Sequence, residues 1–238
     1  MKRARRPPRP RRLTLVVGTG RVGLALAYAQ ARYGDVVLLL GRRRGPWTRW
    51  AARQGIEGLT QLEAGRHAPD LVLLAVADEA LAQVAGEVAA ALAPQPRRLV
   101  AHVSGLHGLG PLAPFARRGA AVAALHPVLP FSGPDQMLLD LQGAPVTVLA
   151  GRGARARSLQ LLARWGARPL LLRPGVDRRR YHLGLSLAAN HVTALLAWSE
   201  ALLAPALRAQ ARRGACRLAA AAVARVQALG PEQALTGP

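Results

Sequence analysis

The chain has 238 residues, 51% of them hydrophobic, which is enough to bury one large core or two small ones and argues against global disorder. A single cysteine, Cys216, excludes an internal disulfide framework and fits a reducing compartment, so we expect a cytoplasmic protein. The net charge of +21 raises the question of nucleic-acid binding.

Most of this charge has a compositional explanation. Lys2 is the only lysine, so 32 of the 33 basic residues are arginines, in a chain also rich in alanine, glycine and proline, as GC-rich coding sequences specify. Aromatic residues make up only 4%, which leaves few surfaces on which bases could stack. Residues 1–12 hold seven basic residues and three prolines and are expected to be a disordered tail. We expect nucleic-acid contact only non-specifically, through this tail.

The start of the chain has an alternative interpretation as an export signal. Arg11-Arg12 precede an apolar run, and Ala27-Tyr28-Ala29 resembles a cleavage site, but Arg21 interrupts the run. No uninterrupted apolar stretch reaches the roughly 18 residues of a membrane span. The nearest, residues 183–199, contains two polar side chains in its middle. We therefore expect no association with a membrane.

A glycine-rich turn follows the first predicted strand, residues 13–17. Gly18-Thr19-Gly20-Arg21-Val22-Gly23 has Gly-x-Gly-x-x-Gly spacing, and an apolar helix is predicted over 22–33. In such a unit the first glycine makes the tight turn, the second lets a pyrophosphate approach, and the third lets the helix pack on the strand. The helix N-terminus offers N–H groups to the phosphates. We interpret residues 18–23 as a dinucleotide site, against a glycine-rich turn of another α/β protein.

Further along the chain, apolar runs alternate with helical patterns. The predicted strands span 13–17, 35–40, 71–76, 99–103, 121–125, 146–150 and 169–172, and the predicted helices lie near 22–33, 46–54, 79–92, 109–118 and 154–165. Because the strands are apolar almost throughout, both faces of the sheet should be covered. The pattern predicts an α/β fold, with a Rossmann-type, mostly parallel sheet in a domain over residues 13–173.

The pattern changes after residue 175, beyond which we predict no strand. Asp177 is expected to cap a long helix that runs to about Leu203, and Pro205 to begin the next. A further alanine-rich helix is predicted near 214–229. Residues 174–238 should therefore form a smaller all-α domain for substrate binding or dimerisation.

The end of the second strand indicates which dinucleotide binds. NAD-binding folds place an Asp or Glu there, which accepts hydrogen bonds from the ribose 2′-hydroxyl. Here Gly41 is followed by Arg42, Arg43 and Arg44, without a carboxylate. An acid would repel a 2′-phosphate, whereas a guanidinium pairs with it. We predict NADP as the cofactor, with Arg42 and Arg43 at the 2′-phosphate. Because arginine is abundant throughout, the missing acid is the stronger half of this argument.

Ligands of open α/β sheets bind beyond the carboxyl ends of the strands. Beyond the strand at 71–76, Val76 and Ala77 are expected to line the cofactor, while Asp78 should cap the next helix.

Two further strand ends carry polar residues. Ser104 fits a place facing the nicotinamide and a turn cap equally well, and the preceding His102 is expected to be structural. His126 is interpreted as a site residue or as a satisfied histidine at a strand end, and Phe131-Ser132 follow it.

The helix that begins the α domain carries a polar stripe. Arg178, His182, Ser186 and Asn190 recur at four-residue intervals and so share one face of an otherwise apolar helix. Such a stripe costs stability unless solvent, a partner or a ligand satisfies it. We interpret His182 and Asn190 as site residues, and Ser186 less so.

Reduction of a carbonyl or an imine needs a proton donor beside the accepting atom. The chain has no lysine outside its tail, and arginine stays protonated, so a lysine-based mechanism is excluded. The remaining donors are His182, Tyr181, His126 and Ser104. With Asn190 they are the predicted catalytic residues, and no metal site is expected.

Taken together, these stretches resemble a known group. The chain is similar to bacterial Rossmann-like proteins that carry a C-terminal helical domain of unknown function and are related to pyrroline-5-carboxylate reductase and ketopantoate reductase. The matching stretches lie in the same order over residues 13–238: Gly18–Gly23, Ala75–Asp78, His102–Gly105, His126-Pro127 with Phe131-Ser132, Tyr181-His182 with Asn190, and Ala234–Pro238. The resemblance implies an NADP-dependent oxidoreductase and leaves the substrate unspecified.

The chain departs from this family at two places. The family usually has a lysine just before the Tyr-His pair, where this chain has Arg178, and its helical domain continues past the Thr-Gly-Pro turn. We therefore expect a truncated helical domain. Two functions follow: an oxidoreductase that transfers hydride to or from a small carbonyl or imine, or a non-catalytic NADP(H) sensor. Related helical domains pair across a dimer, so we also expect a homodimer.

Overall fold

A computed structural model describes residues 11–95, 97–129, 141–173 and 175–235. Most of the predicted tail, the pair Phe131-Ser132 and the terminal Thr236-Gly237-Pro238 lie outside the described residues. Contacts divide the chain into two units, 1–181 and 182–238. The expected domain boundary before residue 174 stays a prediction.

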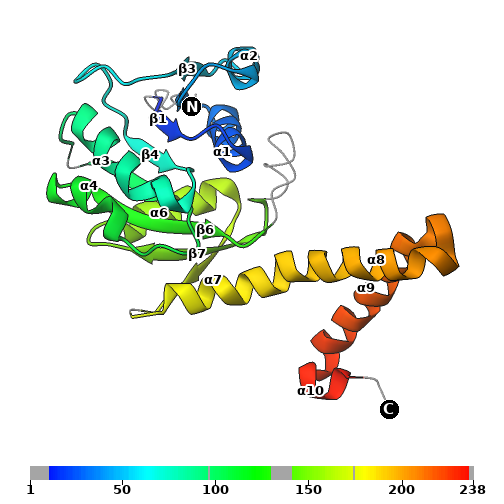
Figure 1. The fold of residues 1–238 in the computed structure, drawn as a ribbon. Coiled ribbons are helices and arrows are strands. Elements are labelled where there is room, and N and C mark those ends of the chain that lie inside the picture. The colour runs from blue at the N-terminus through cyan, green and yellow to red at the C-terminus, as the bar shows by residue number, and fades with distance from the viewer. Residues whose placement is uncertain (1–10, 96, 130–140, 174, 236–238) are drawn as a thin grey trace, which may run out of the picture. The chain divides into compact units, whose positions relative to one another are not determined.

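The first unit is built on a sheet with helices around it (Figure 1). Its eight strands lie in the order β3-β2-β1-β4-β5-β6-β7-β8. All neighbouring pairs are parallel except β6 with β7, which is antiparallel. The strands are β1 (Leu13–Val17), β2 (Val36–Leu40), β3 (Glu57–Leu59), β4 (Leu71–Leu74), β5 (Leu99–His102), β6 (Ala121–Pro127), β7 (Pro145–Ala150) and β8 (Arg168–Leu171). The predicted Rossmann-type, mostly parallel sheet is confirmed.

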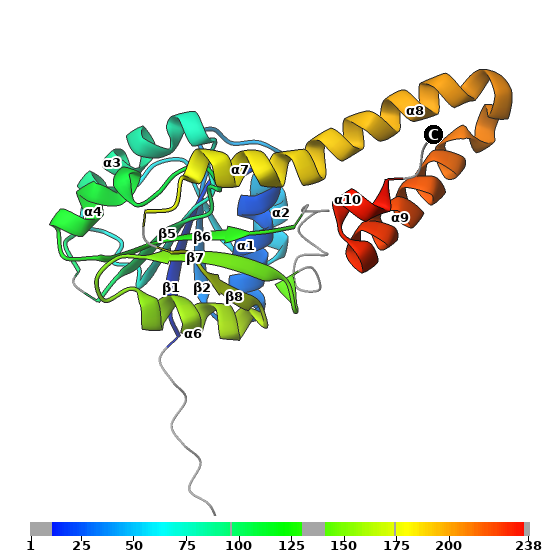
Figure 2. The ribbon, with the colours of Figure 1, turned by 90° about the horizontal axis from the view of Figure 1, so that it is seen from below.

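Helices cover both faces of this sheet (Figure 2). They are α1 (Arg21–Arg32), α2 (Pro46–Arg53), α3 (Leu81–Ala91), α4 (Ala113–Arg117) and α6 (Arg155–Trp165). Because side chains alternate along a strand, Val16 joins the core beneath α1, α2 and α6, while Leu15 and Val17 join the core beneath α3 and α4. Burial on both faces explains why the strands from β1 to β7, apart from the edge strand β3, are mostly continuous apolar runs, whereas β3 and β8 are largely exposed.

Three local predictions were wrong. Strand β3 was not predicted, because its three residues contain a glycine and a glutamate and lie at the sheet edge. Asp78 does not cap a helix; it begins the short 3-10 turn Asp78–Ala80 ahead of α3, and its side chain makes no capping hydrogen bond. Pro205 does not begin a helix either, since it lies inside α8 (Val192–Leu207).

Beyond residue 176 the described residues form helices, short helical turns and their connections, without a strand. Asp177 caps α7 (Arg178–Ser186) as predicted, since its Oδ1 accepts the N–H groups of Arg179 and Arg180 at 2.9 and 3.1 Å. A π-helical turn, Leu187–His191, joins α7 to α8. A short 3-10 turn then leads to α9 (Ala211–Leu229), and α10 (Pro231–Ala234) ends the described chain.

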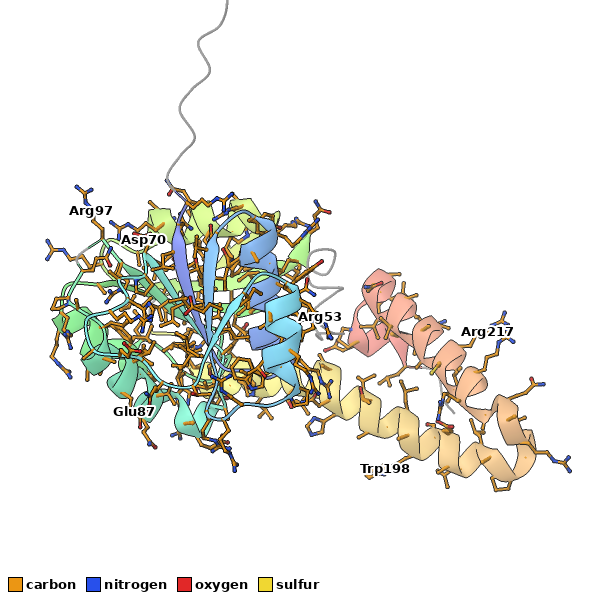
Figure 3. All side chains as sticks on the ribbon, turned by 90° about the horizontal axis from the view of Figure 1, so that it is seen from above. Arg53, Asp70, Glu87, Arg97, Trp198 and Arg217 are labelled. Atoms are coloured by element: carbon orange, nitrogen blue, oxygen red, sulfur yellow. The ribbon has the colours of Figure 1, made fainter. Side chains whose placement is uncertain are left out.

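The second unit exposes much apolar surface. Helices α8 and α9 lie side by side as a hairpin, and Trp198 projects from α8 with 69% of its surface exposed (Figure 3). Other exposed apolar side chains of this unit are Leu183, Leu187, Val192, Leu195, Leu202, Leu207, Leu218, Val223, Val226, Leu229 and Leu235. By length and composition alone, one helical stretch, Arg178–Leu229, would suffice to cross a membrane, and its most apolar window is unburied.

Candidate functional site

The three glycines of the turn after β1 differ in their surroundings. Gly18 has φ +115°, and a Cβ there would collide with the carbonyl oxygen of Ala75. A Cβ on Gly23 would collide with the carbonyl oxygen of Gly18, so α1 packs tightly against the turn. A Cβ on Gly20 would meet no atom within 4 Å. The turn is therefore tight at its first and third glycines and open at its second, as close approach of a pyrophosphate requires.

Gly20 faces a cavity of about 750 Å³ at the carboxyl ends of the strands. Of the predicted cofactor-binding residues, the cavity wall includes Gly18, Thr19, Gly20, Arg42, Val76 and Ala77. It does not include Arg21, Val22, Gly23 or Arg43. Further lining residues that sequence reasoning missed are Thr60, Gln61, Leu62, Ala80, Gln83, Val84, Glu87, Val88 and Ala91. The first three follow the unpredicted β3, and the others come from α3 and the turn before it.

The arginine segment after β2 is fixed by Trp47 of α2. The indole N–H of Trp47 donates to the carbonyl oxygen of Arg43 at 2.9 Å. A Cβ on Gly41 would lie 2.6 Å from both Trp47 Cζ2 and Thr19 Cγ2, so this segment packs closely on the glycine turn. Arg42 lines the cavity, whereas Arg43 takes part in holding the segment. No periodicity in the sequence could have identified Trp47.

His102 ends β5 and is fully buried. Its Nδ1 accepts the backbone N–H of Ser104 at 3.2 Å, which leaves Nε2 to donate to the carbonyl oxygen of Gly108 at 2.8 Å. Burial is the main reason why the pKa of His102 falls to about 4. The ring is therefore neutral at pH 7, with its proton on Nε2, and supports the loop that follows.

Ser104 lies in that loop, two residues after His102. Its Oγ accepts the backbone N–H groups of Leu106 and His107, each at 3.1 Å, and its carbonyl oxygen accepts Nη2 of Arg178 at 3.0 Å. Nε2 of His107 lies 3.1 Å from the carbonyl oxygen of Asp78, which ties this loop to the one after β4. The side chain thus makes a turn, and its catalytic role stays a prediction.

A polar cluster forms around the hydroxyl of Tyr181. Nδ1 of His126 and Oγ1 of Thr147 each lie 3.0 Å from this hydroxyl, and the rings of His126 and Tyr181 meet edge to face with centroids 5.9 Å apart. The guanidinium carbon of Arg178 lies 4.8 Å from the centroid of the Tyr181 ring. The structure brings together three predicted residues: His126, Tyr181 and, through Arg178, Ser104. Thr147 was missed because only the antiparallel register of β6 and β7 places it opposite His126.

The other two predicted catalytic residues belong to the second unit. Asn190 is exposed within the π-helical turn, and His182 is partly buried in α7. The π turn changes the angular spacing, so the four-residue stripe assumed from the sequence does not continue regularly from Ser186 to Asn190. Their catalytic roles stay predictions. The described residues include no group of His, Cys, Asp and Glu that could hold a metal ion.

The sequence of each part matches a known domain. Residues 4–127 match the Rossmann-like domain, and residues 144–238 match DUF2520, a domain of unknown function. The chain belongs to the Rossmann-like family. The DUF2520 match follows the Rossmann-like match in the order that the resemblance predicted, so this resemblance is confirmed. A search of the curated proteins with the whole sequence found no match.

Solved structures share this fold. A protein from Bacteroides fragilis provisionally described as an NADP oxidoreductase is 19% identical, with a TM-score of 0.77 over 96% of this chain and 85% of that one. A pyrroline-5-carboxylate reductase from Coxiella burnetii is 11% identical, with a TM-score of 0.66 over 96% and 86%. An imine reductase from Pseudomonas sp. is 16% identical, with a TM-score of 0.60 over 93% and 79%. At such identities the likeness establishes the fold.

Proposed function

We propose that the chain is an NADP-dependent oxidoreductase that transfers hydride to or from a small carbonyl or imine substrate. The observation that carries the proposal is the open space at Gly20, in the wall of a cavity that Arg42 also lines. A dinucleotide pyrophosphate fits this turn, and a guanidinium fits a 2′-phosphate. Glu87 also lines the cavity, but it comes from α3 and accepts a hydrogen bond from Gln83 at 2.8 Å. Oxidoreductases among the solved structures of this fold add support.

In this proposal the Tyr181 cluster supplies the proton. NADPH, when bound, supplies the hydride. The Tyr181 hydroxyl donates a proton to the substrate oxygen or nitrogen, while Thr147 and His126 keep it oriented. The cluster lies beyond β6, and the cofactor cavity lies beyond β1 and β4, with β5 between them. The carboxyl ends of parallel strands lie at the same end of the sheet, and neighbouring strands are about 5 Å apart. Both sites therefore lie at that end of the sheet.

The preference for NADP is tested at Arg42. Arg42→Ala should weaken NADPH binding by about tenfold or more, because a hydrogen bond to a charged group contributes about 1.5–3 kcal/mol, and should leave NADH binding nearly unchanged. Arg43→Ala is the matched control, because Arg43 does not line the cavity. Fluorescence titration with both cofactors measures the effect. An equal loss for NADH, or an equal effect of the control, would contradict the assignment.

A non-catalytic NADP(H) sensor is the second candidate, favoured by Arg178 in the place where the family usually has lysine. NADPH oxidation with a panel of small carbonyls and imines separates the two. If the chain is an enzyme, Tyr181→Phe should lower kcat about 100-fold and leave NADPH affinity unchanged. Tyr28→Phe, on α1, is the control for the same change outside the cluster. Cofactor binding without turnover of any substrate would favour the sensor.

We also propose that the second unit pairs with a second copy of the chain. The apolar side chains exposed on α8 and α9 exceed what a two-helix hairpin can bury within itself. A membrane is the alternative partner for this apolar surface, because the stretch Arg178–Leu229 is long and apolar enough to span one. A soluble dimer in the cytoplasm is the form that we expect.

A further inference from the structure

Arg178 is a buried cation that is only partly satisfied. The residue is 9% exposed. Its Nη2 donates to the carbonyl oxygen of Ser104 at 3.0 Å, and its guanidinium stacks on Tyr181. Its Nε and Nη1 are also buried, and they have no hydrogen-bond partner among the described residues. Two nitrogens that normally donate are therefore left without an acceptor beside the proposed proton donor.

The charge of Arg178 also lacks a counter-ion among the described residues. The ion pairs formed there involve other arginines, namely Arg66, Arg164 and Arg212. Burial lowers the pKa of Arg178, and the effect that opposes it comes from the charge interaction with Tyr181 and not from a carboxylate. An arginine does not lose its proton in a protein, so the charge persists. A buried charge without a partner is costly, which points to an anion that is bound when the site works.

The size of the charge indicates the class of anion. Among the described residues, Arg178 is the only permanent cation in contact with the Tyr181 ring, so it supplies one fixed positive charge to the site. A carboxylate carries one negative charge and matches a guanidinium in shape. A phosphate dianion would leave one charge uncompensated in a largely buried place. Tyr181 and His126 are partly exposed, so solvent reaches the edge of the cluster, whereas Nε and Nη1 of Arg178 are covered and a ligand must displace part of this cover to reach them.

We propose that Arg178 binds the carboxylate of the substrate, so that the substrates are small oxo or imino acids. The inference rests on the proposed function and narrows its substrate class. With the carboxylate on Arg178, the neighbouring carbonyl or imine lies next to the Tyr181 hydroxyl. The arginine then replaces the family lysine as an anchor for the substrate, and the proton comes from Tyr181.

The test compares an acid with its neutral methyl ester, which lacks the charge and adds one methyl group. Pyruvate and its neutral methyl ester are titrated by NMR into the full chain, with and without NADP⁺, so that turnover is not needed. Wild type should bind pyruvate about tenfold tighter than methyl pyruvate, because the acid gains charge-assisted hydrogen bonds. Arg178→Gln should abolish this preference, and Arg178→Lys should retain part of it. Arg180→Gln, on the exposed side of α7, should retain all of it.

Three outcomes would overturn the proposal: equal binding of the acid and the ester to wild type, tighter binding of inorganic phosphate than of pyruvate, or a preference that survives in Arg178→Gln. Urea unfolding without ligand distinguishes a structural role of Arg178 from a role in substrate binding. Arg178→Gln should keep or raise the unfolding midpoint, since it removes a buried unpaired charge. A lower midpoint with an unchanged preference would assign Arg178 to structural support alone. NADPH titration of the same samples tests the cofactor site separately, because its failure would contradict the proposed function and not the preference for pyruvate.

Discussion

At the scale of single residues, identical side chains have different roles that only their surroundings reveal. Gly18, Gly20 and Gly23 are equivalent in the motif, yet two of them are enclosed by backbone and one faces the cavity. The arginines after β2 also differ, since Arg42 lines the cavity, whereas Arg43 does not and only its backbone carbonyl oxygen accepts the indole N–H of Trp47. The sequence could predict the positions of these residues, and packing decides which of them can contact a ligand.

Alanine substitutions separate the two roles of the glycines. Gly20→Ala should fold normally and weaken NADPH binding at least tenfold, because the new methyl group projects into the space for the pyrophosphate. Gly23→Ala should lower the free energy of unfolding by about 2 kcal/mol or more, because its Cβ would collide with the Gly18 carbonyl. Thermal unfolding and NADPH titration of both variants measure these effects. Equal loss of stability in both would refute the assignment.

His102 predicts a pH dependence of stability. Its pKa of about 4 in the folded protein lies below the usual value of 6.5, so the unfolded chain binds the proton more tightly. The contribution of His102 to the free energy of unfolding is complete above pH 6.5 and is lost as the pH falls toward 4. The total loss amounts to about 3 kcal/mol. Urea unfolding of wild type and His102→Gln between pH 7 and 4 measures it. The variant should show a flatter dependence, and parallel curves would rule out this role for His102.

At the scale of elements, the apolar runs predicted every strand of the sheet except β3. Most of these strands are buried and therefore apolar, whereas β8 is exposed and was predicted from its leucines. The β3 edge strand has no such run, and its absence hid the segment Thr60–Leu62 that lines the cavity. The Asp177 cap could be predicted because it is a local interaction, whereas Pro205 was misplaced because a proline can lie near the end of a helix without ending it at once.

Helix α2 positions the arginine segment, and this can be tested at Trp47. Trp47→Ala removes both the hydrogen bond to Arg43 and the packing on Gly41, so NADPH affinity should fall several-fold and stability by about 2 kcal/mol. Trp50→Ala is the control on the same helix, because Trp50 contacts Tyr28 instead, with ring centroids 6.4 Å apart. It should lose stability and retain NADPH affinity. Loss of affinity in both variants would indicate a general effect of disturbing α2.

At the scale of the whole molecule, the two candidate sites differ in how far the sequence could predict them. The glycine turn and Arg42 lie within 25 residues of one another, so their relation follows from one βαβ pattern. The Tyr181 cluster unites residues that are 34 to 74 positions apart. Thr147 and the buried state of Arg178 depend on strand register and tertiary packing, which no local pattern specifies. The sequence therefore predicted the binding fold better than the chemistry.

The exposed apolar surface of the second unit predicts its self-association. Leu202 and Leu218, on α8 and α9, are 81% and 73% exposed, and a second copy of the chain would bury such side chains. Wild type should therefore sediment as a dimer, and the double variant Leu202→Glu with Leu218→Glu as a monomer. Leu171→Glu is the control, because Leu171 is exposed on β8 of the first unit. A wild-type monomer would contradict the dimer. Wild type that floats with phospholipid vesicles would contradict it as well and would favour binding to a membrane.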